Sequence, residues 1–366
     1  MLLHRKGQFA LSTLGIAFSV VIMFMEIGFF NGINDSQARL ATHLNGDLVL
    51  IHQKRYSLLE SDQIHRITMQ QALAHDAVIA AAPLYEANAL VTDRETGMAQ
   101  AISVLAFPAY TRPLNVKGLD ELEELLAIEG NIAFDRESRD LYGDVTAGGT
   151  LSLGNSTYQV VGLVEMGPSL KSDGYIFMGA HTWNKTRAEA DLINMAVLTL
   201  KAGTDATVVR ESLAVKLGPD ILIFTPEELR QREVDFTTHS TPVGGVFAIG
   251  VLIGFVIGLI ICYQILFNEI SDNMPQYATV KAVGFPRRYL ISLVLQQAVL
   301  LAIFGFIPGL ASGYTLYQVI ESSTSILMFI TIERAAFIFV LTLVMCILSG
   351  LLAVQKVLQA DPADVF

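Results

Sequence analysis

Charge and cysteine are both scarce in this chain. Only 16% of its 366 residues are Asp, Glu, Lys or Arg, against about 25% in an average soluble domain. The two cysteines, Cys262 and Cys346, lie inside apolar runs and lack the spacing of a metal site or a redox pair, so we predict that they pack as small apolar side chains. With 52% hydrophobic residues and a mean hydropathy of +0.49, the composition favours a membrane protein over a soluble one.

Motifs of catalysis and metal binding are missing from the sequence as well. It contains no Walker A motif, no Gly-x-Ser-x-Gly elbow and no pair of histidines at metal-ligand spacing. The seven histidines are scattered along the chain. We therefore predict no catalytic residues, no metal site and no cofactor, and an independent membrane enzyme is the least favoured class.

Positive charge is in deficit, and the deficit lies in one segment. Residues 31–242 contain 28 Asp and Glu but only 17 Lys and Arg, which accounts for the whole net charge of −11. A protein that binds nucleic acid usually presents a basic face. The acidic balance therefore argues against a nucleic-acid partner and indicates a solvated acidic surface.

Long apolar runs are what this sequence does have. Four of them cover about 9–30, 243–267, 290–319 and 335–354. A bilayer core of about 30 Å requires ~20 apolar residues in a helix, and each run reaches that length. We predict an α-helical membrane protein with four transmembrane helices, one plus three, and a mixed α/β extracytoplasmic domain. The predicted divisions are 1–31 for the cytoplasmic N-terminus and first span, 32–242 for the periplasmic domain, and 243–366 for the last three spans.

Basic residues flank the runs unevenly. They stand before the first run, between the second and third, and after the fourth: His4, Arg5, Lys6, Lys281, Arg287, Arg288 and Lys356. The loop between the third and fourth runs holds only Arg334. Because basic loops stay in the cytoplasm, we expect both termini and the loop 268–289 to be cytoplasmic and the large domain to lie outside.

The segment between the first two runs has the pattern of a mixed α/β domain. We expect strands over 47–51, 78–84 and 101–106, helices over 61–73 and 119–129, a hairpin of 150–153 with 158–164, and a strand–helix–strand unit over 196–200, 206–217 and 221–225. Ser61 or Asp62 is the expected cap of the first of these helices.

One carboxylate stands inside the first apolar run. Ionisable residues within a membrane span are costly and often functional. Glu26 lies near the outer end of its run, about one helical turn inside it, where water can reach it. Two interpretations stay open, an interfacial side chain and a role in a translocation or relay path.

The loop 268–289 predicts a short capped helix on the cytoplasmic side, over about 272–284. Asp272 or Asn273 can cap its start, Pro275 suits its first turn, and Gly284 can end it in the left-handed conformation before Pro286. We expect its apolar residues to bind a partner, unless the helix is merely an interfacial connector. The proposed contact residues are Tyr277, Val280, Lys281, Val283 and Gly284, with Lys281 at the rim.

Small residues repeat along the second run. Gly250, Gly254 and Gly258 are four residues apart, so they share one face of a helix, as in small-xxx-small packing. We expect this face to contact a second copy of the chain. The alternative is that it packs within the subunit.

Several segments together resemble the FtsX/MacB-type ABC permeases. YATVKAVGF, which follows a span, resembles the coupling-helix region of that family, and the one-plus-three layout is similar to theirs. The sequence further resembles the DevC branch, in the segments MFMEIGFFNGINDS, APLYEA, FDRESRDLYG, VVGLVEMGPSLKSDG, IFTPEEL, TTHSTPVGGVFAIGVLIGFVIGLIICYQILFNEISDN and DPADVF. The cytoplasmic segment before the first span is short, so we expect the N-terminal amphipathic helix of relatives to be truncated or absent.

The resemblance implies the permease subunit of a tripartite exporter in the bacterial inner membrane. Such a subunit dimerises, recruits a separate ABC ATPase subunit, and works with a periplasmic membrane-fusion adaptor and an outer-membrane TolC-like channel. It exports a lipid or other amphiphile by mechanotransmission. Two alternatives stay open: an FtsX-like membrane regulator of a periplasmic cell-wall hydrolase, and a sensor without an ATPase partner.

Overall fold

The computed structural model describes residues 6–92, 97–186, 191–324, 326 and 328–359, and its fold divides into two compact units. The helical unit comprises Met1–Gly32 and Pro242–Phe366. The α/β domain comprises Ile33–Thr241. The limits expected from the sequence, 32 and 242, fall one residue outside the α/β domain on each side.

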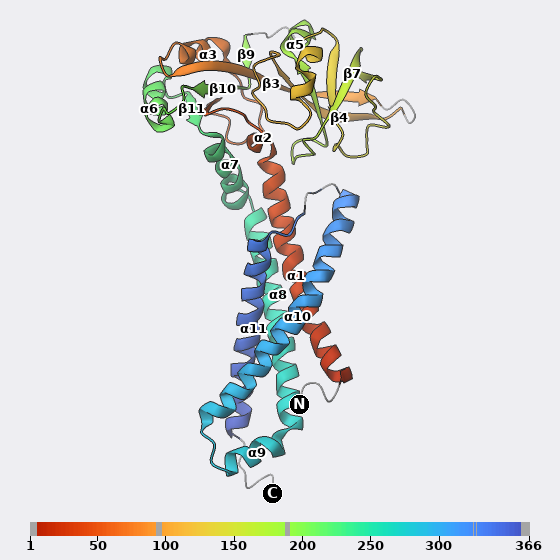
Figure 1. The fold of residues 1–366 in the computed structure, drawn as a ribbon, viewed down its shortest axis with the longest axis vertical. Helices are drawn as coiled ribbons and strands as arrows, with labels where there is room; N and C mark the ends of the chain where they lie inside the picture. Colours follow the sequence, from red (N-terminus) through yellow and green to blue (C-terminus); the bar gives the residue numbers. More distant parts are fainter. Residues whose placement is uncertain (1–5, 93–96, 187–190, 325, 327, 360–366) are drawn as a thin grey trace. The chain divides into compact units, whose positions relative to one another are not determined.

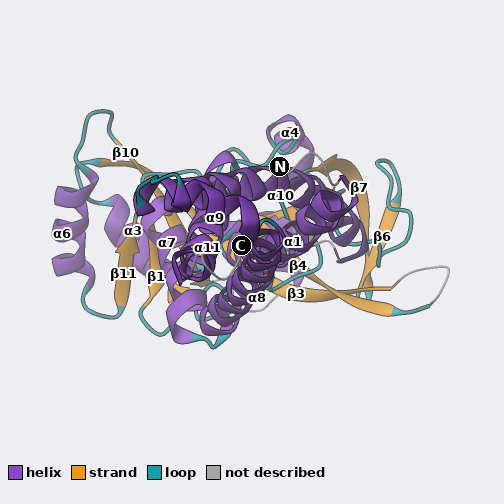
Figure 2. Cartoon of the chain, turned by 90° about the horizontal axis from the view of Figure 1, so that it is seen from below, coloured by secondary structure: helices purple, strands orange, loops and turns teal. Residues whose placement is uncertain are grey.

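Four long helices and one short helix make up the helical unit. Their bounds are α1 Lys6–Gln37, α8 Val243–Asp272, α9 Met274–Ala282, α10 Arg287–Thr324 and α11 Ile332–Gln359. Within the described part of the chain, α1, α8, α10 and α11 are each long and apolar enough to cross a membrane, which confirms the four predicted spans. Figures 1 and 2 show these helices gathered in one bundle. The terminal residues His4 and Arg5 and the motif DPADVF lie outside the described residues.

Glycines bring α1 close to two of its neighbours. On α10, a β-carbon at Gly309 would come within 2.6 Å of Val20, and one at Gly305 within 2.5 Å of Ile16. On α8, a β-carbon at Gly254 would lie 3.0 Å from a side chain of α1. Since lipid supplies no hydrophobic drive between helices, close packing at small residues is what holds such a bundle together.

Both cysteines lie in the apolar core of this bundle. Cys262 of α8 and Cys346 of α11 are free thiols with no exposed surface. They share a hydrophobic cluster with Val20, Phe24 and Leu301. The expectation that they pack as small apolar side chains is confirmed.

The α/β domain contains short helices and many strands. Its helices are α2 Arg39–Thr42, α3 Arg66–Leu73, α4 Glu123–Leu126, α5 Ala180–Thr186, α6 Ala206–Leu217 and α7 Pro226–Asp235, with single turns η1 Asp120–Leu122 and η2 Phe236–Ser240. Its strands are β1 Leu48–His52, β2 Ile64–His65, β3 Val78–Thr92, β4 Ala99–Phe107, β5 Asn131–Asp135, β6 Thr150–Leu153, β7 Ser156–Val164, β8 Tyr175–Gly179, β9 Leu192–Ile193, β10 Met195–Leu200 and β11 Ile221–Phe224.

The long strand β3 joins two parts of one nine-stranded sheet, ordered β11-β1-β10-β3-β4-β8-β5-β7-β6 (Figure 1). Its first half pairs with β10 and its second half with β4. A further pairing, Val91 with Leu153, links β3 to β6, so the six strands from β3 to β6 close into a ring. The pairs β4–β8 and β5–β7 are parallel. The mixed α/β class is confirmed.

The strand β1 is buried on both of its faces. Leu48 and Leu50 belong to one hydrophobic cluster and Val49 and Ile51 to another, and all four side chains are fully buried. Alternate residues of a strand point to opposite faces. This explains why the strand is an unbroken apolar run in the sequence rather than an alternating one.

Two of the expected helices differ from the structure. The helix expected to begin at Ser61 or Asp62 starts at Arg66, because Ile64 and His65 pair with β9 as strand β2. The helix expected over 119–129 is reduced to η1 and α4. The hairpin of β6 and β7 is confirmed, as is the unit β10–α6–β11, although β1 lies between its two strands.

Candidate functional site

The short helix α9 ends as the sequence predicts but begins differently. Gly284 has φ +96°, and its N–H donates to the carbonyl of Lys281 at 3.1 Å, while that of Phe285 donates to Val280 at 3.3 Å. These two bonds form a Schellman motif, which favours glycine at the left-handed position.

The expected side-chain cap at the start of α9 is wrong. Asn273 is the single residue between α8 and α9, and its Nδ2 donates to the carbonyl of Glu269 at 2.7 Å. It therefore closes the end of α8, which runs through Asp272. Pro275 does lie in the first turn of α9, as expected.

One side of α9 faces the bundle and is buried. Tyr277 is 6% exposed, and Val280 packs against the same cluster. The Tyr277 hydroxyl donates to Oε1 of Gln297 at 3.4 Å, and Gln297 Nε2 lies 3.4 Å from Oε1 of Glu269. Burial raises the pKa of the Tyr277 hydroxyl. Tyr277 and Val280 pack against the bundle here, so their contact with an ATPase stays a prediction.

The chain just beyond the end of α9 is exposed and apolar. Val283 is 72% exposed, Phe285 45% and Tyr289 41%, and the rings of Phe285 and Tyr289 lie 4.7 Å apart. Arg287 and Arg288 are exposed beside them. We call these five residues the coupling surface. Exposed apolar clusters with a polar rim are typical of protein-binding sites.

Sequence reasoning found only part of the coupling surface. It placed Val283 there and Lys281 at the rim; Lys281 is half-buried, and its place at a rim stays a prediction. It missed Phe285 and Tyr289, which stand on either side of the turn after Gly284. The sequence signal that could have found them is Gly284, which ends the helix. Residues after the end of a helix no longer follow the face that the helix buries.

A cavity of about 280 Å³ lies between α9 and α10. Three glutamines, one tyrosine and three aliphatic side chains line it: Gln276, Gln296, Gln297, Tyr277, Val280, Leu293 and Leu300.

The glycine face of α8 is occupied within the subunit. A β-carbon at Gly250 would collide with the Glu26 carboxylate, and one at Gly258 with Ser19 and with Met345 of α11. Ser19 Oγ donates to the carbonyl of Gly254 at 2.5 Å. The structure thus brings Glu26 together with the glycine stripe. Contact of this face with a second copy stays a prediction.

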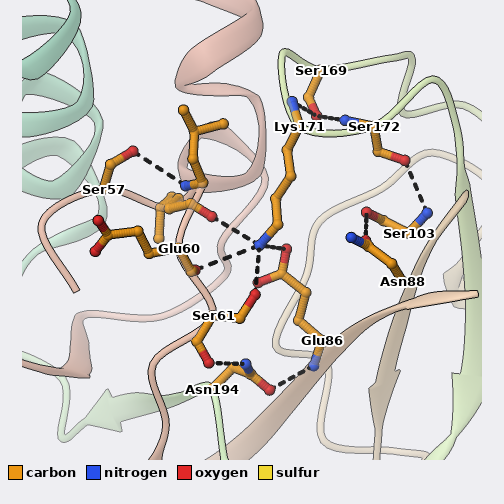
Figure 3. Close-up of polar contacts among 12 residues, drawn as sticks. Ser57, Glu60, Ser61, Glu86, Asn88, Ser103, Ser169, Lys171, Ser172 and Asn194 are labelled. Carbon is orange, nitrogen blue, oxygen red and sulfur yellow. Dashed lines mark hydrogen bonds and ion pairs between the residues drawn. The ribbon is translucent and has the colours of Figure 1, made fainter. Parts of the chain in front are cut away.

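In the α/β domain, charged side chains are buried around the middle of β3 (Figure 3). Nη2 of Arg55, which is fully buried, lies 2.7 Å from Oε2 of Glu86, and Nζ of Lys171 lies 2.9 Å from Oε1. Burial lowers the pKa of Lys171, and the charge of Glu86 opposes that shift. Asn194 Oδ1 accepts from the N–H of Glu86 at 2.8 Å. Glu86 stands where β3 leaves β10 and joins β4, so the network fixes the crossing point of the two sheet parts.

A second buried carboxylate continues this network. Glu233 of α7 has no exposed surface and accepts from Gln37 Nε2 at 2.7 Å and from Ser57 Oγ at 2.8 Å. Arg55 and Glu233 are both in polar stretches of sequence, which are typical of solvated side chains. The network joins residues far apart in the chain, so no local sequence pattern predicts it.

Comparison with known proteins places both units in one family. Residues 9–215 match the MacB-like periplasmic core domain and residues 246–362 the FtsX-like permease C-terminal domain. The chain is 23% identical over 197 residues to an uncharacterized ABC transporter permease of Methanocaldococcus jannaschii, an alignment covering 52% of this chain and 46% of that protein. The chain thus spans about half the length of the curated relative it matches.

Two solved structures are similar to parts of the fold. The periplasmic region of MacB from Actinobacillus actinomycetemcomitans aligns with 52% of this chain and 92% of its own, at 12% identity and a TM-score of 0.38. The extracellular domain of the noncanonic ABC-type transporter YknZ from Gram-positive bacteria aligns with 49% of this chain and 100% of its own, at 8% identity and a TM-score of 0.37. On the match of its domains, and with four apolar helices beside a mixed α/β domain, the chain belongs to the FtsX/MacB-like family of ABC transporter permeases.

Proposed function

We propose that this chain is the permease subunit of an ABC exporter and relays ATP-driven movement from a separate ATPase subunit to its α/β domain. The coupling surface carries the proposal. Val283, Phe285 and Tyr289 expose apolar surface next to two arginines, at the end of a helix that is tied to α8 and α10. A partner that covers the apolar patch and offers acidic residues to Arg287 and Arg288 would fit it.

The loop charges support an orientation with α9 in the cytoplasm. Lys281, Arg287 and Arg288 stand at this end of the bundle, whereas the connection from α10 to α11 carries only Arg334, in the first turn of α11. The Arg334 guanidinium lies 5.0 Å from the Phe329 ring and donates to the Phe329 carbonyl, so even this charge is held locally. By the positive-inside rule, both termini would be cytoplasmic and the α/β domain periplasmic, in a bacterial inner membrane.

Mechanotransmission fits the way in which the bundle is packed. Glycines on both α8 and α10 face α1, so α1 fills the space between them. A single subunit packed in this way has little room for a solvated path. We propose that a DevC-type exporter of this chain and a second copy moves a lipid or other amphiphile with a periplasmic adaptor and a TolC-like channel. Glu26, seated in the notch at Gly250, is the candidate for a relay inside the bundle.

Purification of the tagged full chain from native membranes in mild detergent tests the proposal. Co-elution of an ATP-binding subunit together with a membrane-fusion adaptor is the expected result. Co-elution of an ATP-binding subunit with a cell-wall hydrolase would instead support the FtsX-like regulator. If no ATP-binding subunit co-elutes, the proposed coupling function is wrong.

A further inference from the structure

The chain passes between its two units at only two places. They are the bond between Gly32 and Ile33 and the bond between Thr241 and Pro242. The first lies inside α1, which continues unbroken to Gln37. The second follows α7 and η2 and directly precedes α8. Any movement passed from one unit to the other along the chain must travel through these two connections.

Both connections end on the same buried carboxylate. Gln37 is the last residue of α1, and its Nε2 donates to Oε2 of Glu233 on α7 at 2.7 Å. Ser57 Oγ donates to the same oxygen at 2.8 Å, and the N–H of Leu58 lies 3.0 Å from each carboxylate oxygen. Gln37 Nε2 also donates to Ser57 Oγ at 2.6 Å. Glu233 has no exposed surface and Gln37 is 5% exposed.

The same segment leads on to the centre of the sheet. The carbonyl of Arg55 accepts from Nη2 of Arg232, which precedes Glu233 on α7, at 2.9 Å. The Arg55 guanidinium pairs with Glu86 at the crossing point of β3. The ends of both connecting helices are therefore joined to β3 through residues 55–58.

A buried carboxylate is a poor way merely to fill a core. Removing a charge from water is costly, and a well-packed apolar side chain of similar size usually stabilises a fold as well or better. What the carboxylate adds is direction, since its two oxygens accept from one helix end and one loop at fixed angles. The Glu233 carboxylate therefore fixes the relative positions of the helix end and the loop.

We propose that Glu233 is the positioning residue that fastens α1 and α7 to each other and to β3, so that both connections move the α/β domain as one. This joint rests on the proposed relay function for its use, but its existence is a property of the α/β domain itself. Its contacts lie wholly within residues 33–241.

Hydrogen exchange of the full chain in nanodiscs tests the joint without any partner. Glu233→Gln places an amide N–H₂ against donors from Gln37, Ser57 and Leu58. We expect exchange to rise on the order of tenfold, equivalent to about 1.4 kcal/mol, in 226–240 and equally in the distant 33–42. The matched control is Glu227→Gln on the same helix, where the exposed carboxylate pairs with Arg230, and it should change neither segment. A rise confined to 226–240, or no rise, overturns the joint.

A second set of experiments distinguishes a positioning role of Glu233 from a contribution to the stability of the fold alone. The double variant Gln37→Glu with Glu233→Gln restores a carboxylate–amide pair between the helices with the charge on the other side, and it should recover most of the lost protection. In the complex purified with its ATPase, Glu233→Gln should keep ATP hydrolysis within about twofold of wild type while the ATP-dependent exchange change in the α/β domain is lost. An unchanged ATP-dependent response in the variant overturns the joint.

The two proposals fail in different ways. If no ATPase co-purifies with the wild-type chain, the relay function fails, and the nucleotide-free exchange still decides the joint. If Glu233→Gln does not fold, Ser57→Ala removes one of the donors and should raise exchange in both segments by a smaller factor. No change in either segment for Ser57→Ala would then count against the joint.

Discussion

The helical unit and the α/β domain hold distant parts of the chain together by opposite means. In the helical unit, α1 meets α8 and α10 at glycines, and Ser19 of α1 donates to the carbonyl of Gly254 on α8. In the α/β domain, residues up to 196 positions apart meet through buried charges. In lipid, helices associate through close packing of their backbones. A domain outside the lipid can hold a charged network only inside a core that its sheets already provide.

Each region also carries its own intrinsic probe. The only tryptophan, Trp183, is buried in the α/β domain with its ring 5.7 Å from that of Tyr85. The only cysteines, Cys262 and Cys346, are buried in the helical unit. Tryptophan fluorescence and thiol labelling therefore follow the two units separately in the full chain.

The largest expected effect is in the α/β domain. Arg55→Met leaves Glu86 buried with only Lys171 as a cationic partner, and we expect a loss of about 3–5 kcal/mol in unfolding free energy. The measurement is denaturant unfolding followed by Trp183 fluorescence, with thiol labelling of the helical unit unchanged. Arg112→Met, which breaks the pair between the exposed Arg112 and the partly buried Glu123, is the control and should cost about 0–1 kcal/mol. Equal losses would show that the buried network does not hold the domain.

The corresponding change in the helical unit should be smaller and seen only by the thiols. Gly309→Ala puts a β-carbon 2.6 Å from Val20 of α1, and overpacking of this kind costs about 1–3 kcal/mol. Thiol labelling during heating should therefore begin at a lower temperature. Gly245→Ala, where a β-carbon meets nothing within 4 Å, should be neutral or stabilising by up to about 1 kcal/mol. The account of the bundle fails if both variants shift labelling alike.

Cross-linking tests whether the glycine face of α8 contacts a second copy of the chain or only its own subunit. In a chain whose two native cysteines are replaced by alanine, Ile253→Cys should give a product between two copies, because Ile253 is 52% exposed. Gly254→Cys should give none, because Gly254 faces Ile22 and Met23 of the same chain. A strong product at 254 and none at 253 would instead place the glycine face of α8 at the contact with a second copy.

The smallest effect concerns the start of α7. Hydrogen bonding to the Thr225 N–H, then pairing with Arg210, holds the pKa of Glu228 below its ordinary 4.5. A lowered carboxyl pKa stabilises the fold above 4.5, and that stability is lost as pH falls through the lower folded value. Glu228→Gln keeps the capping box, so it should cost only about 0.3–1 kcal/mol at pH 7 and nothing once both forms are uncharged. Glu211→Gln, on the exposed face of α6, is the control, and a cost that does not change with pH would contradict this assignment.

The two units also differ in how much of each the sequence predicts. Spans and the hairpin of β6 and β7 follow from patterns within about 20 residues, and the left-handed end at Gly284 from a single residue. The glycine repeat on α10 had the same spacing as the one on α8, so it was visible in the sequence. The network of Arg55, Glu86 and Glu233 was not, since each residue alone looks like a surface charge.

Helix α9 shows the same limit at the candidate site. The sequence placed the helix and its end, but not which side of it the bundle covers. Tyr277 is buried, and its hydroxyl donates to Gln297, which lies twenty residues further along the chain on α10. Only the packing of three helices decides that Val283, Phe285 and Tyr289 are the residues left outside.

The most direct test of the relay function measures how much ATP-binding subunit each permease retains after purification. Val283→Asp puts a charge at the most exposed apolar residue of the coupling surface and should lower retention at least tenfold, because an apolar anchor at an interface commonly contributes ~2 kcal/mol or more. Val215→Asp makes the same change at an 88% exposed residue of α6, and retention should equal that of wild type. Equal retention for both variants would contradict the assignment of the coupling surface.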